Sequence, residues 1–207
     1  MKTITSLFIA LLFNSFLFLD GCDKSESEVQ ANYVLNDTSV AEWKGSSPAV
    51  FHEGDFAVTS QNLRVVNDKI KSGTFTIPIA SIRNFDLPDE VKPILLNHLK
   101  SADFFNMALY PNASFTISRV TPYNGKAKNA IAGANYTITG NFTMLNKTNT
   151  ISFPAKINIS NGKLSAEANL TLDRTQWGMT YAADPALGEH HILPEVGIHL
   201  KLAGQKI

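Results

Sequence analysis

Three polar residues of this chain have side chains and positions that could contribute to chemistry. His98 and Asp103 lie five residues apart in "NHLKSADFF" (residues 97–105), and Arg174 lies in "LDRTQWGMTY" (residues 172–181). An arginine can pair with a phosphate or carboxylate, and His98 could donate a hydrogen bond to the same group. The alternative roles are structural: Asp103 caps a turn, His98 is a satisfied core histidine, and Arg174 pairs with a carboxylate or a backbone carbonyl. We favour the structural role for Asp103 and leave the other two residues open.

A metal site and a catalytic site are weakly supported. Glu189-His190-His191 is the densest group of metal-ligand types, but adjacent histidines on a strand point to opposite sides and no third ligand lies at a suitable spacing. The chain has no G-x-S-x-G elbow, no Gly-rich phosphate loop and no H-E-x-x-H helix. We therefore expect no metal, no cofactor and no catalytic residue.

Most of the chain consists of predicted strands, because apolar and polar residues alternate along it. Alternation is clear over residues 73–79, 114–118, 136–144, 151–159, 164–172 and 196–202, and weaker strands are expected over 33–44, 51–59 and 62–66. Asn67-Asp68, Asn146-Lys147 and Asn161-Gly162 separate such runs and predict hairpin turns, since asparagine tolerates the left-handed conformation.

Residues 88–99, "PDEVKPILLNHL", are the exception and predict a helix. An apolar stripe recurs at helical intervals, and it consists of Val91, Ile94, Leu95 and Leu99, with His98 on the same stripe.

Strands with one apolar face must bury that face, and a two-sheet sandwich or a closed barrel does so. Several runs reach nine residues, roughly 30 Å, and small residues (Gly140, Ala166, Ala168) lie on the apolar faces. We therefore predict an all-β antiparallel barrel of about eight strands with one short helical segment, which could hold one small ligand. The alternative is a membrane barrel with its apolar faces turned to lipid, against which the lack of aromatic girdles argues.

The N-terminal segment predicts export. Lys2 precedes an apolar run over residues 7–19, and "LDGC" (residues 19–22) resembles the lipobox of bacterial lipoproteins. The resemblance implies a signal peptide over 1–21, lipidation of Cys22, a flexible tether over 22–31 and one domain over 32–207. It places the domain outside the cytoplasm, on the periplasmic side of the bacterial cell envelope, and leaves open which membrane holds the anchor. The alternative is an uncleaved membrane anchor.

Composition limits the partners. The chain has 18 basic and 18 acidic side chains and no dominant basic patch, so we expect no nucleic-acid partner. Cys22 is the only cysteine, so no intrachain disulfide forms and packing alone stabilises the domain. A homodimer stays open.

Several stretches in order resemble the YceI-like family of lipid- and polyisoprenoid-binding proteins. They are "SVAEWKG", "HEGDF", "SGTFTIPIASI", "LLNHLKSADFFNMALYPNASFTI", "GNFTMLNKTNTISFPAKI" and "LDRTQWGMTY", within residues 33–202. The resemblance implies a lipocalin-like barrel with a helical segment that holds a long apolar chain in its lumen, in a family not known for catalysis. The family commonly has glycine where this chain has Asn146, which can adopt the same positive φ.

The predicted function is to bind, and carry or sequester, an isoprenoid or acyl lipid in the lumen, where each buried CH₂ contributes about 0.8 kcal/mol. The lumen candidates are Trp43, Phe56, Phe75, Ile77, Phe104, Phe105, Phe115, Ile117, Ile138, Phe142, Phe153, Ile157 and Trp177, with His98 and Arg174 at the polar end. Of Phe104 and Phe105, we expect one to close the lumen and the other to pack under the helix. The alternatives are ordinary core packing, an enzyme with His98 or His52 as base, and an envelope interaction protein with a filled barrel. The identity of the lipid and the role of the Glu189-His190-His191 loop stay open.

Overall fold

The structure is a computed structural model that describes residues 28–207, so the predicted signal peptide and Cys22 lie outside the described residues. The strands are β1 (Gln30–Leu35), β2 (Val40–Ser46), β3 (Phe51–Ala57), β4 (Leu63–Val66), β5 (Lys69–Ser72), β6 (Thr74–Pro78), β7 (Arg83–Asn84), β8 (Asn112–Pro122), β9 (Tyr136–Met144), β10 (Lys147–Ser160), β11 (Lys163–Asp173) and β12 (Glu195–Lys206). The helices are α1 (Lys92–Lys100) and three 3₁₀ segments, η1 (Ile79–Ser81), η2 (Arg174–Trp177) and η3 (Pro185–His190). Among residues 28–207, no helix has the length and apolarity needed to cross a membrane.

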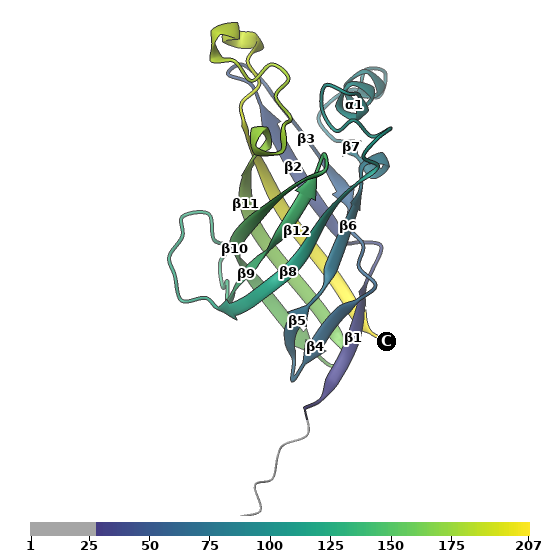
Figure 1. The fold of residues 1–207 in the computed structure, drawn as a ribbon, viewed down its shortest axis with the longest axis vertical. Helices are drawn as coiled ribbons and strands as arrows, with labels where there is room; N and C mark the ends of the chain where they lie inside the picture. The colour runs from purple at the N-terminus through teal and green to yellow at the C-terminus, as the bar shows by residue number, and fades with distance from the viewer. Residues whose placement is uncertain (1–27) are drawn as a thin grey trace, which may run out of the picture.

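The strands form one antiparallel sheet that curls into a nearly closed barrel (Figure 1). The order is β5-β4-β1-β12-β11-β10-β9-β8-β6, and β2, β3 and β7 continue from β12. The two ends of this order are joined covalently through Gly73, whose carbonyl also accepts a hydrogen bond from Ile117 N. A bridge between Thr59 and Thr76 links the end of β3 to β6. The predicted all-β antiparallel barrel with one short helix is therefore confirmed.

The strands outnumber the predicted eight because long strands are interrupted. β1 and β2 both pair with β12, so they are two pieces of one predicted strand, separated at residues 36–39. Two further strands were not predicted: β5, which pairs with β4 and is joined to β6 through Gly73, and the two-residue β7, which pairs with β3.

The predicted helix is present but shorter and rotated. Residues 88–91 form turns, and α1 begins at Lys92 with Pro93 in its first turn, where a proline is tolerated. Leu95 and Leu99 face the barrel interior as expected. Val91 and Ile94 do not, and Ile94 is 70% exposed. Half of the predicted stripe is therefore wrong, because the short helix turns only one narrow face to the barrel.

The predicted hairpin turns are found, one of them shifted by one residue. Asn67 and Asp68 have φ of 48° and 56°, and Asn161 and Gly162 have φ of 51° and 71°. The third turn is formed by Leu145 and Asn146, with φ of 51° and 58°, rather than by Asn146-Lys147. Asn146 thus adopts the positive φ expected at this position.

The two ends of the barrel differ. The lower end in Figure 1, where β1 begins and the chain terminates, is filled by the buried side chains of Tyr33, Leu63, Val65 and Leu164. We call it the closed end. The upper end is bordered by α1, the β2–β3 connection and the loop that contains η3, and we call it the mouth. The fold therefore provides a cup whose interior is reached from one side.

Candidate functional site

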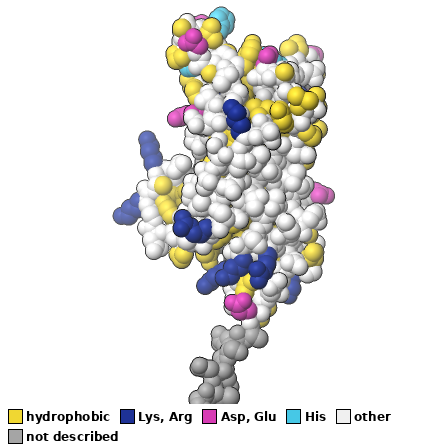
Figure 2. All heavy atoms as spheres, in the orientation of Figure 1, with side chains coloured by type: hydrophobic (Ala, Val, Ile, Leu, Met, Phe, Trp, Pro, Cys, Tyr) yellow, Lys and Arg dark blue, Asp and Glu magenta, His cyan; other side chains and the backbone are white. Residues whose placement is uncertain are grey.

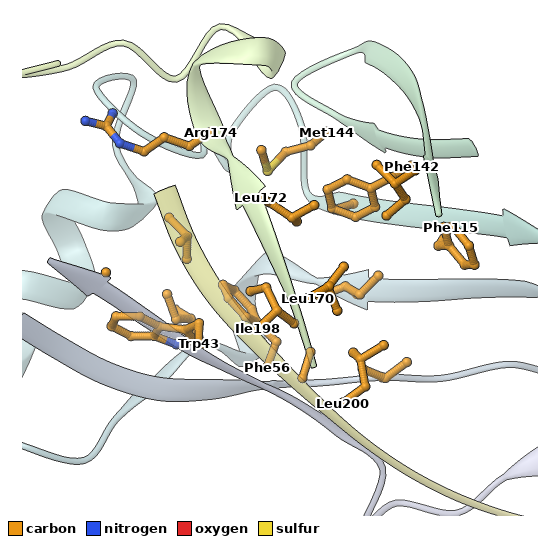
Figure 3. Close-up of a pocket in the computed structure, with 18 of the residues that line it drawn as sticks. Trp43, Phe56, Phe115, Phe142, Met144, Leu170, Leu172, Arg174, Ile198 and Leu200 are labelled. Carbon is orange, nitrogen blue, oxygen red and sulfur yellow. The ribbon is translucent and has the colours of Figure 1, made fainter. Parts of the chain in front are cut away.

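An apolar cavity of about 450 Å³ occupies the barrel between the mouth and the closed end. Inward side chains from β2, β8, β9, β11 and β12 surround it, as Figure 3 shows for Trp43, Phe115, Leu170 and Ile198 among others. The volume falls in the range of small-molecule sites. A cavity lined by hydrocarbon stays dry, so an apolar ligand meets little competition from water there.

All residues predicted for the lumen except Trp177 lie on the cavity wall. Trp177 is buried behind the wall at the end of η2, where its Nε1 donates to the Phe142 carbonyl at 3.0 Å and its ring packs on the Phe142 ring at 5.3 Å. The assignment of Trp177 to the lumen is wrong because this residue lies in the 3₁₀ segment after β11, where strand alternation no longer sets the direction of the side chain. Lipid contact by the other candidates stays a prediction.

Phe104 and Phe105 both reach the wall. The segment after α1 consists of turns, so strand alternation does not apply to it. The Phe105 ring meets Phe56 edge-on at 5.4 Å, and Phe104 packs against the rings of His98 and Tyr181. Both phenylalanines therefore lie where the lumen list placed them, and which of them closes the lumen stays a prediction.

Glycine shapes the wall at one position. The Phe115 ring lies over Gly140 on the adjacent strand, so a Cβ at this glycine would lie 2.4 Å from Phe115 Cζ and 2.5 Å from the Thr116 carbonyl oxygen. Phe115 also contacts Phe75 and Phe153, with ring centroids 6.2 and 5.8 Å apart. The space left by Gly140 therefore seats an aromatic ring and does not widen the cavity.

Two histidines, each paired with an aspartate, lie on the wall toward the mouth. His52 Nδ1 is 2.7 Å from Asp86 Oδ2, and His98 Nε2 is 3.0 Å from Asp103 Oδ2. Asp103 therefore orients His98 rather than capping a turn, and the predicted cap is wrong. Burial raises the pKa of Asp86, but hydrogen bonds from the Glu53 backbone N–H, His52 and Asn84 outweigh it, so the pKa is below its ordinary value.

Arg174 reaches the cavity wall near the mouth but is already bonded to backbone. Nη1 donates to the Met179 carbonyl at 2.7 Å, and Nη2 donates to the carbonyls of Tyr181 and Ile192 at 2.9 and 2.8 Å. Nε donates to the Leu193 carbonyl at 3.2 Å, which leaves one of five N–H groups for a ligand. Burial lowers the pKa of the guanidinium. The geometry favours the structural role, in which Arg174 fastens the loop after η2 to the end of β11.

The Glu189-His190-His191 loop does not assemble ligands. Glu189 and His190 are exposed at the end of η3, whereas His191 is buried. No group of three or more His, Cys, Asp or Glu side chains that could hold a metal occurs among residues 28–207. Within the same residues, three buried polar side-chain atoms have no hydrogen-bond partner: Trp43 Nε1, Ser60 Oγ and His191 Nε2.

The sequence reasoning missed part of the wall. Leu170 and Leu172 of β11 and Ile198, Leu200 and Leu202 of β12 all line the cavity. Their alternation already placed them on inward faces, so the preference for aromatic residues, rather than the strand pattern, excluded them. The β2–β3 connection also lines the cavity, through Ser47 and Val50, but a connection has no alternating pattern from which this could be predicted.

Comparison with known proteins gives one family and several similar folds. A family model described as the YceI-like domain matches residues 22–203. BcnA from Burkholderia cenocepacia is 22% identical, covers 80% of this chain and 95% of its own, and superposes with a TM-score of 0.59. A polyisoprenoid-binding domain from Saccharophagus degradans, implicated in plant cell wall breakdown, is 12% identical. The match covers 86% of this chain and 99% of that domain, with a TM-score of 0.61. No curated protein matches the chain. At these identities the two solved structures support the barrel fold alone.

Proposed function

Because the chain belongs to the family of YceI-like domains, we propose that it binds a lipid with a long apolar tail, of isoprenoid or acyl type, in the barrel lumen. The observation that carries the proposal is the cavity of about 450 Å³, which is closed at one end and lined almost entirely by apolar side chains. One protein with the same barrel fold is described as a polyisoprenoid-binding domain, and we carry that class of ligand into the proposal. The barrel is not filled by its own side chains, which disfavours an interaction protein with a solid core.

The physical basis is desolvation. A prenyl or acyl tail exposes apolar surface in water, and each methylene moved into a dry lumen contributes about 0.8 kcal/mol. The wall supplies few polar contacts, so tail length contributes most of the affinity and the head group lies near His52 and His98 at the mouth.

We propose binding without catalysis. Each histidine at the mouth has one aspartate partner, and within residues 28–207 neither hydrogen-bonds a serine or threonine that it could activate. If the chain is instead an enzyme, His98 or His52 is the candidate base.

The proposed setting is the bacterial cell envelope. A signal peptide over residues 1–21, a lipid on Cys22 and a tether to residue 31 would hold the barrel outside the cytoplasm, where it carries or sequesters its ligand. Support comes from the lipobox-like "LDGC" alone.

Native mass spectrometry of freshly purified full chain tests the proposal. We expect a co-purified lipid that is released on denaturation and replaced by an added prenol. A chemically altered lipid after incubation would favour the enzyme instead. A chain that carries no lipid and takes up neither a prenol nor a fluorescent fatty acid would contradict the proposal.

A further inference from the structure

One wall of the barrel carries basic side chains and no acidic ones. No Asp or Glu occurs between Asp103 and Glu167, and this stretch contains β8, β9, β10, their connections and the start of β11. It contains six exposed basic residues, which we call the basic wall: Arg119, Lys126, Lys128, Lys147, Lys156 and Lys163. Figure 2 shows Lys and Arg side chains over the middle and lower part of this face and one group in its upper part, with acidic side chains at its edges and ends. The whole-chain charge of zero conceals this local excess, and the expectation that no nucleic acid is a partner stays a prediction.

These six side chains are free of ion pairs. Among residues 28–207, no carboxylate oxygen lies within 4.0 Å of any of them. Elsewhere, Lys44, Lys92 and Lys201 are neutralised locally by Glu53, Asp89 and Glu42. Among residues 28–207, Lys69, Lys71, Lys100 and Lys206 have no carboxylate within 4.0 Å either. The charge of the basic wall is therefore available to an external anion.

The basic wall adjoins the end at which the chain leads back to the proposed anchor. Lys163 pairs with Gln205 of β12, and Gln205 also pairs with Val34 of β1, so this end of the wall lies at the level of the first strand. Lys147 lies at the other end of the wall, beside Gly178. Five residues lie between Cys22 and Glu28, so the chain spans at most roughly 22 Å between them. A membrane that holds Cys22 thus lies within reach of the closed end.

The loop that contains η3, one border of the mouth, has the opposite charge, whereas α1, another border, carries Lys92 and Lys100. Residues 181–195, which border the mouth, contain Asp184, Glu189 and Glu195 and no Lys or Arg. An anionic surface attracts the basic wall and repels this loop, so the two regions orient the barrel in the same sense.

We propose that the basic wall docks on the anionic head groups of the membrane that holds the chain, and that this contact keeps the mouth away from that membrane. The inference rests on the proposed anchor at Cys22. Phosphate groups of anionic lipids are the occupant, because lysines and arginines without partners near a bilayer bind them in proportion to their number.

Lysine footprinting of the full chain tests the docking. The chain is reconstituted into vesicles of phosphatidylcholine, with or without phosphatidylglycerol, and treated with a water-soluble amine reagent whose adducts are read by peptide mass. We expect labelling of Lys126, Lys128, Lys156 and Lys163 to fall about threefold or more in the anionic vesicles. Lys92 and Lys100 of α1 are the internal controls and should label equally in both. High salt should remove the protection, since it screens exposed charges.

Charge reversal separates docking from other causes. Lys156→Glu with Lys163→Glu should abolish the protection of Lys126 and Lys128, whereas Lys92→Glu with Lys100→Glu should leave it intact. Equal labelling in both vesicle types overturns the docking and leaves lipid binding in the lumen, measured separately by native mass spectrometry, unaffected. A chain that stays in solution with both vesicle types overturns the anchor and the docking together. Protection by soluble heparin but not by anionic vesicles would assign the wall to an acidic polymer and overturn the membrane proposal.

Discussion

A phenylalanine placed inside the lumen should block ligand binding while leaving the barrel folded. Ala168 lies on β11 opposite Leu200, is 2% exposed and lines the cavity. In Ala168→Phe the new ring projects into a cavity of about 450 Å³ rather than into close-packed core, so we expect a stability loss at or below the usual overpacking cost of about 1–3 kcal/mol.

The loss of affinity follows from the tail that the ring displaces. If it excludes about three methylenes at about 0.8 kcal/mol each, binding weakens by about 2.4 kcal/mol, roughly 60-fold in Kd. Displacement of a fluorescent fatty acid measures the affinity, and thermal unfolding verifies that the variant is folded. Ser165→Phe is the matched control, because Ser165 lies on the same strand and is exposed on the outer face. A folded Ala168→Phe that binds like the wild type, or a Ser165→Phe that loses as much affinity, would refute a ligand site in the lumen.

Three further predictions concern stability. Gly140→Ala should destabilise the barrel by about 1–3 kcal/mol in chemical denaturation, since its Cβ overlaps a ring and a carbonyl, whereas Gly45→Ala, with no atom within 4 Å of its Cβ, should be neutral. Trp177→Phe should cost about 1 kcal/mol more than Trp43→Phe, because only the Trp177 indole N–H has an acceptor; equal costs would contradict this. Hydrogen bonds outweigh burial and lower the pKa of Asp86 in the folded chain. The ionised Asp86 carboxylate therefore stabilises the fold fully above the unfolded-state pKa of about 3.9, and this contribution is lost as pH falls through the lower folded-state pKa. The stability difference between wild type and Asp86→Asn should therefore shrink as pH falls below about 4, and a difference that stays the same or grows below pH 4 would refute it.

Much of the barrel could be predicted from the sequence because strand alternation is local. The inward faces of residues 136–144 and 164–172 follow from period two alone, and their side chains line the cavity. The interruptions at residues 36–39 and Gly73 depend on pairing with distant strands, which no local pattern encodes. For the same reason one predicted strand divides into β1 and β2.

The polar residues of the site were the hardest to assign. Residue type suggested a head-group role for Arg174, yet its position at the end of β11 places four backbone carbonyls around the guanidinium. Trp177 is a large aromatic residue of the kind expected in the lumen, but it lies at the end of η2, where its side chain packs behind the cavity wall. Whether a side chain meets a ligand or its own backbone depends on loop geometry, and alternation carries no information about loops.

The dependence of affinity on tail length tests lumen binding most directly. Full chain freed of lipid is titrated with a homologous series of unbranched fatty alcohols that share one head group. A tail buried in the lumen predicts that each added methylene tightens binding about fourfold until the cavity is full, after which the affinity levels off, and that Ala168→Phe brings this plateau to a shorter tail. An affinity that is independent of tail length, or a plateau unchanged in Ala168→Phe, would contradict the proposal that the lumen holds the ligand.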